Sequence, residues 1–326
     1  MQSARPILVR IVQDDVLKFK ADVLVLKYAQ SLYGADFAAY RHLTDSGFKV
    51  KLPREGDYAF LQTEGTLPAT HLLFVGVAEL HRLSYLGIRY FASQALAILA
   101  EEHPEAKHLA ITLHGPGYGL DEQEAFESEL AGLLESLSSN RYPPSLEKIS
   151  IVERNATRAE RLRNMLQVIL PASEKGWRFL SPVKIPADAV LRTAGQLSAD
   201  KQHVFVAMPF IEAMDDTFHY GIESAVRAAG MLCERADLSI FAGDIMDWVR
   251  ERIETAELII ADLTTANPNV YLEVGYAWGR GIPTVLLSKD ASDLKFDVRG
   301  QRCLIYKSIR QLEEVLTREL KALSKH

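Results

Sequence analysis

Two carboxylates in the segment from residue 261 to residue 277 are the residues best suited to carry chemistry. Asp262 ends an apolar run, and a polar turn follows it. Asn267 and Pro268 are expected to begin a helix as N-cap and first helical residue, which puts Glu273 in its second turn. In open parallel sheets, ligands bind outside the carboxyl ends of the strands. A carboxylate there could act as a nucleophile, an electrostatic stabiliser or a proton donor.

Each carboxylate also has a purely structural interpretation. Asp262 could cap the turn that follows the strand, and Glu273 could be a solvated side chain on the helix surface. Helical spacing argues against the second alternative, because Val270, Val274 and Ala277 form one apolar stripe and Glu273 flanks it. The sequence therefore favours Glu273 as the chemical centre.

Further candidates for substrate binding follow predicted strands or lie near the start of predicted helices. Arg235 ends a strand and offers a charge-assisted fork for phosphate oxygens, and Asp237 close by could contact a sugar. An ordinary surface ion pair is the alternative interpretation of Arg235. The set of candidates is Met208, Pro209, Phe210, Arg235, Asp237, Asp244, Asn267 and Asn269.

The strands that must position these residues alternate with helices along the second half of the chain. Continuous apolar runs such as 258–261 and 284–287 are typical of strands covered on both faces. The expected strands are 203–208, 231–235, 256–263, 282–287 and 302–306, and the expected helices are 215–229, 244–255, 268–280 and 309–323. This alternation predicts a Rossmann-like (flavodoxin-like) α/β domain with a parallel sheet over residues 201–326.

The first half shows a similar alternation and predicts another α/β domain over residues 1–170. The expected strands are 7–12, 21–26, 71–77, 107–113 and 148–152, and the expected helices are 85–102, 121–137 and 156–166. Residues 171–200 lose this periodicity and are punctuated by proline and glycine, which indicates a connecting segment.

Two motifs of the second half resemble the nucleoside 2-deoxyribosyltransferase superfamily. Residues 203–210, HVFVAMPF, are similar to that family's first strand and loop. Residues 271–277, YLEVGYA, are similar to the helix that carries its nucleophilic glutamate. The resemblance implies cleavage of an N-glycosidic bond at ribose C1′, with Glu273 beside an oxocarbenium-like centre. It also implies a second polar group, Asp262 or Asp244, that assists departure of the base.

Three positions depart from the transferase pattern. Phe205 stands in place of a tyrosine that orients the nucleophile, Met208 replaces a loop glycine, and Asn267 replaces an aspartate that reads the base. These departures argue against deoxynucleoside transfer. The superfamily also includes nucleotide N-glycoside hydrolases and TIR-like domains that cleave NAD, so hydrolysis of a nucleotide or of NAD stays open.

A glycine-rich loop at residues 114–120 follows a predicted strand of the first half. Such loops let backbone N–H groups approach a phosphate, although strand-to-helix turns also use glycine for geometry. The loop and the opening strands resemble macro domains, which implies a three-layer macro-like fold and an ADP-ribose-type ligand. The Val-Asn-Ala-Asn motif of macro domains is missing after Val25, so de-ADP-ribosylation is not expected. The implied ligand residues are Asp22, His114, Gly115, Gly117, Tyr118 and Gly119.

The composition restricts the classes of molecule that this chain is expected to bind. A net charge of -6 favours neither nucleic acid nor an anionic membrane, and no apolar run reaches the length of a membrane helix. Cys233 and Cys303 share no CxxC spacing and are expected to be reduced, buried thiols. We expect a cytoplasmic homo-oligomer with no metal and no cofactor, which takes NAD or another nucleotide as substrate or signal.

The leading hypothesis is an N-glycosidase-type hydrolase that cleaves the base–ribose bond of a nucleotide. Its N-terminal domain would regulate it through an ADP-ribose-derived signal, as in bacterial antiviral defence. The alternative is a non-catalytic protein whose two halves bind nucleotides and relay a signal to a partner. Phe205 and Met208, the departures near the expected site, favour this alternative.

Overall fold

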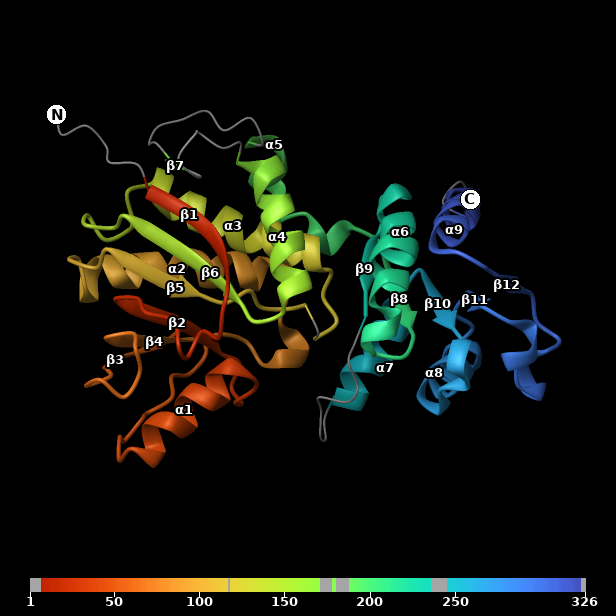
Figure 1. Cartoon of the computed structure of the whole chain (residues 1–326), viewed down its shortest axis with the longest axis horizontal. Helices are drawn as coiled ribbons and strands as arrows, with labels where there is room; N and C mark the ends of the chain where they lie inside the picture. The colour runs from red at the N-terminus through yellow and green to blue at the C-terminus, as the bar shows by residue number, and fades with distance from the viewer. Residues whose placement is uncertain (1–6, 117, 171–177, 180–187, 236–244, 324–326) are drawn as a thin grey trace. The chain divides into compact units, whose positions relative to one another are not determined.

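The computed structural model describes residues 7–116, 118–170, 178–179, 188–235 and 245–323 (Figure 1). The chain divides into two compact units. The first comprises Met1–Gly115 and Glu122–Ser198, and the second comprises Pro116–Asp121 and Ala199–His326. The loop segment 116–121, expected in the N-terminal domain, is thus grouped with the second unit. The described part of the expected connecting segment falls almost entirely in the first.

The first unit is built on a seven-stranded mixed sheet with the order β3-β4-β2-β5-β6-β1-β7. The strands are β1 Ile7–Gln13, β2 Val23–Tyr28, β3 Tyr58–Gln62, β4 His71–Gly76, β5 His108–Ile111, β6 Lys148–Glu153 and β7 Arg178–Phe179. The edge strands β3 and β7 are antiparallel to their neighbours, and the other pairs are parallel. The sequence prediction contains the five inner strands and lacks both edge strands.

Helices lie on both faces of this sheet. The unit's helices are α1 Ala35–Asp45, α2 Tyr85–Glu102, α3 Glu122–Ser138, α4 Ala156–Ile169 and α5 Asp188–Thr193. On one face, Ala39 and Leu43 of α1 pack with Leu24 and Phe74 from β2 and β4. Alternate strand residues point to the opposite face, where α2 contacts β4 and packs against α3 (Figure 1).

One buried arginine of α2 anchors part of the expected connecting segment. Arg89 donates hydrogen bonds to the carbonyl oxygens of Leu191, Arg192 and Ala194, at 3.0, 3.1 and 2.8 Å. It also pairs with Glu135 of α3 at 3.1 Å. A buried charge must be satisfied in this way. The fading periodicity of the sequence therefore does not mark a free linker over these residues.

The second unit is built on a five-stranded sheet with the order β12-β11-β10-β8-β9, in which every pair is parallel. The strands are β8 His203–Ala207, β9 Leu232–Glu234, β10 Leu258–Asp262, β11 Thr284–Ser288 and β12 Cys303–Ile305. Counted along the chain, this is the flavodoxin-like order 2-1-3-4-5. Its switch point lies between β8 and β10, so a ligand crevice is expected at the carboxyl ends of these two strands.

Two hydrophobic clusters cover the two faces of the parallel sheet. The helices are α6 Ser224–Ala228, α7 Ile245–Thr255, α8 Pro268–Gly279 and α9 Ile309–Leu323. Val206 of β8 belongs to the cluster with α6 and α9, and its neighbour Phe205 belongs to the cluster with α7 and α8. The predicted fold class, α/β with a Rossmann-like parallel sheet in the second half, is confirmed. Among the described residues, no helix has the length and hydropathy of a membrane span.

The first helix of the second unit differs from the prediction. The sequence predicts one α-helix over 215–229, whereas Thr217–Glu223 is a π-helix that continues into α6. π-helical turns are rare and frequently occur at functional sites. Thr217 and Phe218 of this π-helix are buried.

Candidate active site

The switch point brings two predicted segments together. Ala207, at the end of β8, pairs with Ala261 of β10, so Met208 and Asp262 follow neighbouring positions on adjacent strands. Both side chains are buried, at 6% and 0% exposure. The carboxyl edge of β8 and β10 is therefore the place to look for the site.

Glu273 is buried and has a strongly perturbed pKa. It lies on the core-facing side of α8 with Val270, Val274 and Ala277, and its exposure is 7%. Burial alone raises the pKa of its carboxyl to about 8, and none of the described residues donates a hydrogen bond to it. The alternative of a solvated side chain on the helix surface is wrong. With this pKa, the carboxyl is mainly protonated at pH 7.

Asp262 is fully buried and both its oxygens are engaged. Oδ1 accepts a hydrogen bond from the backbone N–H of Thr264 at 2.9 Å. Oδ2 accepts one from the Tyr306 hydroxyl, just past β12, at 2.7 Å. Burial, and then the nearby Asp262 charge, raise the pKa of Tyr306. Asp262 thus has the structural capping role that the sequence left open, and a role in departure of the base would require these bonds to be exchanged.

The turn between β10 and α8 stores backbone strain. Thr265 and Ala266 have φ angles of 72° and 50°, in the left-handed region, which costs ~1–2 kcal/mol per non-glycine residue. The turn is fixed on both sides. Before it, the hydroxyl of Thr264 accepts a hydrogen bond from the N–H of Lys289 at 3.1 Å. After it, Asn267 caps α8. Such strain persists where the surrounding contacts hold the backbone in place. The turn determines where α8, the helix that carries Glu273, begins.

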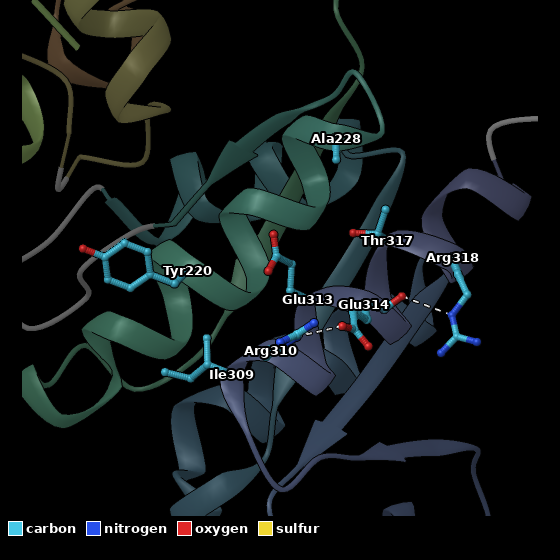
Figure 2. A pocket seen from close by; sticks show the side chains of 8 residues that line it. All are labelled: Tyr220, Ala228, Ile309, Arg310, Glu313, Glu314, Thr317 and Arg318. Atoms are coloured by element: carbon cyan, nitrogen blue, oxygen red, sulfur yellow. Dashed lines mark hydrogen bonds and ion pairs between the residues drawn. The ribbon is translucent and has the colours of Figure 1, made fainter. Parts of the chain in front are cut away.

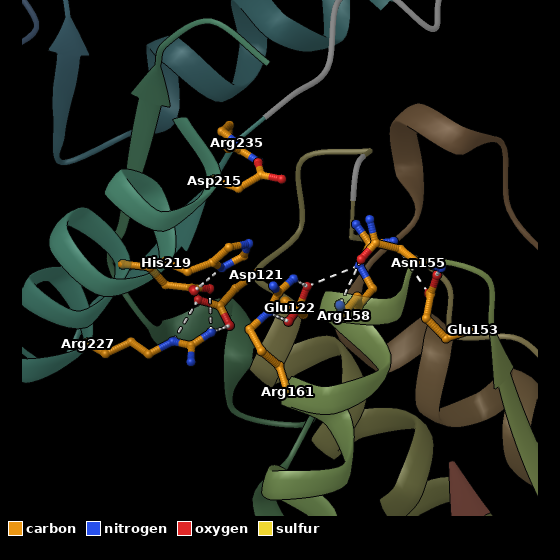
Figure 3. A network of polar contacts seen from close by, with 11 residues as sticks. Asp121, Glu122, Glu153, Asn155, Arg158, Arg161, Asp215, His219, Arg227 and Arg235 are labelled. Atoms are coloured by element: carbon orange, nitrogen blue, oxygen red, sulfur yellow. Dashed lines mark hydrogen bonds and ion pairs between the residues drawn. The ribbon is translucent and has the colours of Figure 1, made fainter. Parts of the chain in front are cut away.

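Arg235, just past β9, is buried between two aromatic rings. Its guanidinium carbon lies 4.0 Å from the ring centre of Phe210 and 3.9 Å from that of Phe218. Nη2 donates to Asp215 at 3.3 Å (Figure 3), and Nη1 lies 3.8 Å from the sulfur of Met208. The interpretation as an ordinary surface ion pair is wrong, because Arg235 is 7% exposed.

The fork of Arg235 is only partly satisfied. Its Nε is buried and has no hydrogen-bond partner among the described residues. Burial also lowers the pKa of Arg235 from its usual value. A buried unsatisfied donor of a cation calls for a partner, and an anionic ligand group is the partner that arginine binds best. The predicted residues Met208 and Phe210 thus serve to hold Arg235 in place.

Other predicted residues are placed elsewhere or lie outside the described residues. Asn267 is the N-cap of α8, as expected, and its Oδ1 accepts from the N–H of Asn269 at 2.9 Å. Pro209 is buried in the loop after β8. Asp237 and Asp244 lie outside the described residues. Among the residues that are described, no group of three or more His, Cys, Asp or Glu side chains could hold a metal ion.

Three residues of this region, Tyr306, Asp215 and Phe218, are not among the predicted site residues. Tyr306 ends a predicted strand at the carboxyl edge, so the rule that selected Asp262 could have found it. Asp215 and Phe218 lie three positions apart in a segment expected to be an ordinary helix. Asp215 precedes the π-helix and Phe218 lies in its first turn, and no local pattern of the sequence indicates that either residue contacts Arg235.

A second polar cluster of this unit holds the segment 116–121. The carboxylate of Asp121 accepts hydrogen bonds from Arg227 at 2.9 Å and from the N–H of Cys233 at 3.0 Å (Figure 3). Arg227 also donates to Glu223 at 2.7 Å. Burial raises the pKa of the Cys233 thiol, which makes it an inert, buried cysteine as predicted. Cys303 is only half-buried, so the expectation of a buried thiol is wrong there.

The residues predicted to form a ligand loop in the first half are not brought together. Asp22 accepts from the N–H groups of Lys107 and His108 at 2.8 and 2.9 Å, at the amino end of β5. His114 follows the carboxyl end of β5, where it is buried, and burial lowers its pKa. Asp22 therefore does not share a site with His114.

The glycines of this loop have the geometry that a turn requires. Gly115 and Gly119 have φ angles of 105° and 98°. Gly115 is grouped with the first unit, whereas Tyr118 and Gly119 are grouped with the second. Gly117 lies outside the described residues. Because the described loop residues are divided between the two units, they do not form one phosphate-binding loop within the first unit.

A shallow hollow on the second unit lies between the π-helix, α6 and α9 (Figure 2). Its charged side chains are mostly partnered locally. Arg310 pairs with Glu314 at 3.0 Å, Arg318 donates to the Glu314 carbonyl at 3.2 Å, and Glu313 accepts from Ser224 at 2.6 Å. These pairings leave little free charge for a ligand, so this hollow is a weaker candidate than the carboxyl edge.

Comparisons with known proteins find similarity in solved structures only. No family model and no curated protein matches the chain. A mutant macrodomain of Oceanobacillus iheyensis is 15% identical, with a TM-score of 0.39, over 49% of this chain and 91% of that one. The macrodomain of ganglioside induced differentiation associated protein 2 is 14% identical, with a TM-score of 0.41, over 51% and 86%.

A Trypanosoma brucei macrodomain, solved in complex with ADP-ribose, is 14% identical. It has a TM-score of 0.39 over 50% of this chain and 74% of that chain. Macrodomains are the neighbours that the sequence resemblance led us to expect for one half of the chain.

Proposed function

We propose that the second unit hydrolyses the N-glycosidic bond of a nucleotide and that Glu273 stabilises or captures the cation formed at ribose C1′. The observation that carries the proposal is the burial of the Glu273 carboxyl with no hydrogen-bond partner among the described residues, and this burial raises its pKa to about 8. Perturbed carboxyls of this kind cluster at functional sites. Its helix starts at the switch point of the sheet, where ligands of this architecture bind.

The pKa of Glu273 favours a substrate whose base is positively charged. A cation within ~4–6 Å lowers a carboxyl pKa by about 1–3 units, so a bound cation converts Glu273 to the carboxylate. The pyridinium ring of NAD carries such a charge, whereas the base of a common nucleoside monophosphate is neutral. We therefore propose an NAD-type N-glycoside as the preferred substrate.

The bonds and charges balance with water as the only co-substrate. The bond between C1′ and the base nitrogen breaks, and its electron pair leaves with the base. The ionised Glu273 either stabilises the ribosyl cation or bonds to it for the length of one turnover. Water then adds to C1′ and releases one proton, which gives free base and the hydroxyl-bearing sugar.

Arg235 supplies the proposed contact to the phosphate. Its unsatisfied buried Nε can donate to a phosphate oxygen, and the rings of Phe210 and Phe218 keep the guanidinium plane fixed. We further propose that a nucleotide signal bound by the first unit, or assembly into a homo-oligomer, switches the hydrolase on in a defence response. Turnover with and without ADP-ribose tests this regulation.

The experiment is a chromatographic assay of base release from NAD, nucleoside monophosphates and deoxynucleosides. It compares the wild type with Glu273→Gln and with Glu251→Gln, a matched control whose exposed side chain lies on α7. Base release by the wild type and the control, but not by Glu273→Gln, supports the proposal. Full turnover by Glu273→Gln contradicts it. Tight nucleotide binding with no release under any condition would favour the non-catalytic alternative.

A further inference from the structure

The first unit contains a cavity that none of the predicted site residues lines. Its volume is about 500 Å³, within the ~300–1,000 Å³ typical of small-molecule sites. It lies where β4 ends and α2 begins, and the segment before β3 closes one side. All of its lining residues belong to the first unit.

The floor of the cavity requires a glycine. A Cβ on Gly76, the last residue of β4, would lie 1.9 Å from the carbonyl oxygen of Arg54. The missing side chain lets the segment 54–57 cross the strand closely, and the N–H of Gly56 donates to the Gly76 carbonyl at 3.0 Å. The crossing fixes the backbone of Glu55 and Asp57, whose side chains are exposed at the rim.

One stripe of α2 forms the wall. Gly87, Tyr90, Gln94 and Ile98 recur at three- and four-residue steps, so they lie on one helix face. Tyr90 is 61% exposed, which leaves its ring available for stacking. Gly87 is the third residue of α2, and glycine within a helix is at most ~1 kcal/mol less favourable than alanine. A Cβ there meets only ordinary contacts with Ser84 and Leu83, so glycine is not required by packing and instead keeps the wall open.

Four polar side chains around the cavity have no hydrogen-bond partner among the described residues. Among the described residues, no hydrogen bond or ion pair joins the side chains of Arg82, Glu55, Asp57 and Gln94 to any partner. Arg82, Glu55 and Asp57 therefore form no ion pair with one another. The cavity has a cationic part, an acidic part and an aromatic ring between apolar walls.

We propose that this cavity binds a nucleoside monophosphate. Arg82 takes the phosphate through charge-assisted hydrogen bonds. Glu55 or Asp57 accepts hydrogen bonds from the ribose hydroxyls, and Tyr90 stacks on the base. This site is separate from the proposed hydrolase and from the glycine-rich loop, and its occupancy does not depend on whether Glu273 acts as a catalyst.

The test is calorimetric titration of the full-length chain carrying Glu273→Gln, so that no probe is consumed. The probes are AMP, GMP, CMP and UMP, with adenosine and ribose 5-phosphate as ligands that lack the phosphate or the base. Three further changes are combined with Glu273→Gln. Arg82→Gln removes the phosphate contact, Gly87→Leu fills the cavity from a helix that tolerates leucine, and Arg41→Gln changes an exposed arginine of α1 as the matched control.

The proposal expects a monophosphate to bind, with at least tenfold weaker binding in Arg82→Gln and no detectable binding in Gly87→Leu. Adenosine should bind the parent and Arg82→Gln equally, and Arg41→Gln should match the parent. Thermal unfolding should show that Gly87→Leu is at least as stable as the parent, because a helical glycine has been replaced. Binding that neither cavity variant changes, or no binding of any probe at millimolar concentration, overturns the proposal. Self-association that buries Tyr90 overturns it as well.

Discussion

Glu273→Gln should stabilise the second unit in a strongly pH-dependent way. The carboxyl has an ordinary pKa of 4.5 when the chain is unfolded and about 8 when it is folded. Between these values the folded state holds a proton that the unfolded state has released. The contribution of the Glu273 carboxyl to wild-type stability is therefore fully present below pH 4.5 and is lost as the pH rises toward 8. At 1.36 kcal/mol per pH unit, the whole rise corresponds to about 5 kcal/mol.

Urea unfolding at several pH values measures this difference. Tryptophan fluorescence is a suitable signal, because Trp248 and Trp278 are two of the three tryptophans and belong to the second unit. The free energy of unfolding of Glu273→Gln should exceed that of the wild type by less than ~1 kcal/mol at pH 5 and by about 4 kcal/mol at pH 8. Glu251→Gln should show no such trend. A difference that stays constant with pH, or a variant that is less stable at pH 8, would refute the assigned burial of Glu273.

Further predictions concern catalysis and the surrounding structure. For a cationic substrate, kcat/KM should rise about tenfold per pH unit below pH 8 and level off above it, because it reports the ionisation of Glu273 in the free protein; a flat profile from pH 6 to 8 would speak against this assignment. Arg235→Lys should raise KM for phosphate-bearing substrates about tenfold and leave neutral nucleosides unaffected, since a charge-assisted bond is worth ~1.5–3 kcal/mol. Tyr306→Phe should lower the free energy of unfolding by ~1–3 kcal/mol, because it leaves one oxygen of buried Asp262 unsatisfied; an unchanged urea midpoint would contradict that role. Thr265→Gly should raise the free energy of unfolding by about 1 kcal/mol, because glycine adopts the left-handed backbone without strain. A loss of stability in this variant would show that the turn is not strained.

Strong hydrophobic periodicity made much of the fold predictable. The bounds of α2 and α9 agree with the sequence prediction, because their apolar residues recur at helical spacing over several turns. The N-cap at Asn267 was also predictable from the local sequence, because asparagine followed by proline is typical of the start of a helix. The missed elements carry weak patterns. β3 is a half-exposed edge strand, and α1 buries only Ala39, Leu43 and Asp36.

The candidate site was predictable in position and only partly in chemistry. The rule for carboxyl ends of parallel strands led to Asp262, and helical spacing led to Glu273. Whether a carboxylate is free or engaged depends on residues distant in sequence. Tyr306 engages Asp262, whereas Glu273 has no such partner among the described residues. The aromatic clamp on Arg235 likewise joins segments whose proximity no local pattern reveals.

The most direct test of the central claim is the rate of nicotinamide release from NAD by the wild type and by Glu273→Gln at one pH near neutrality. The account predicts release by the wild type and a rate at least ~100-fold lower in the variant, in line with the loss of a group that stabilises the transition state. Equal rates in the two proteins would contradict it, because the buried carboxyl at the switch point would then have no part in breaking the bond.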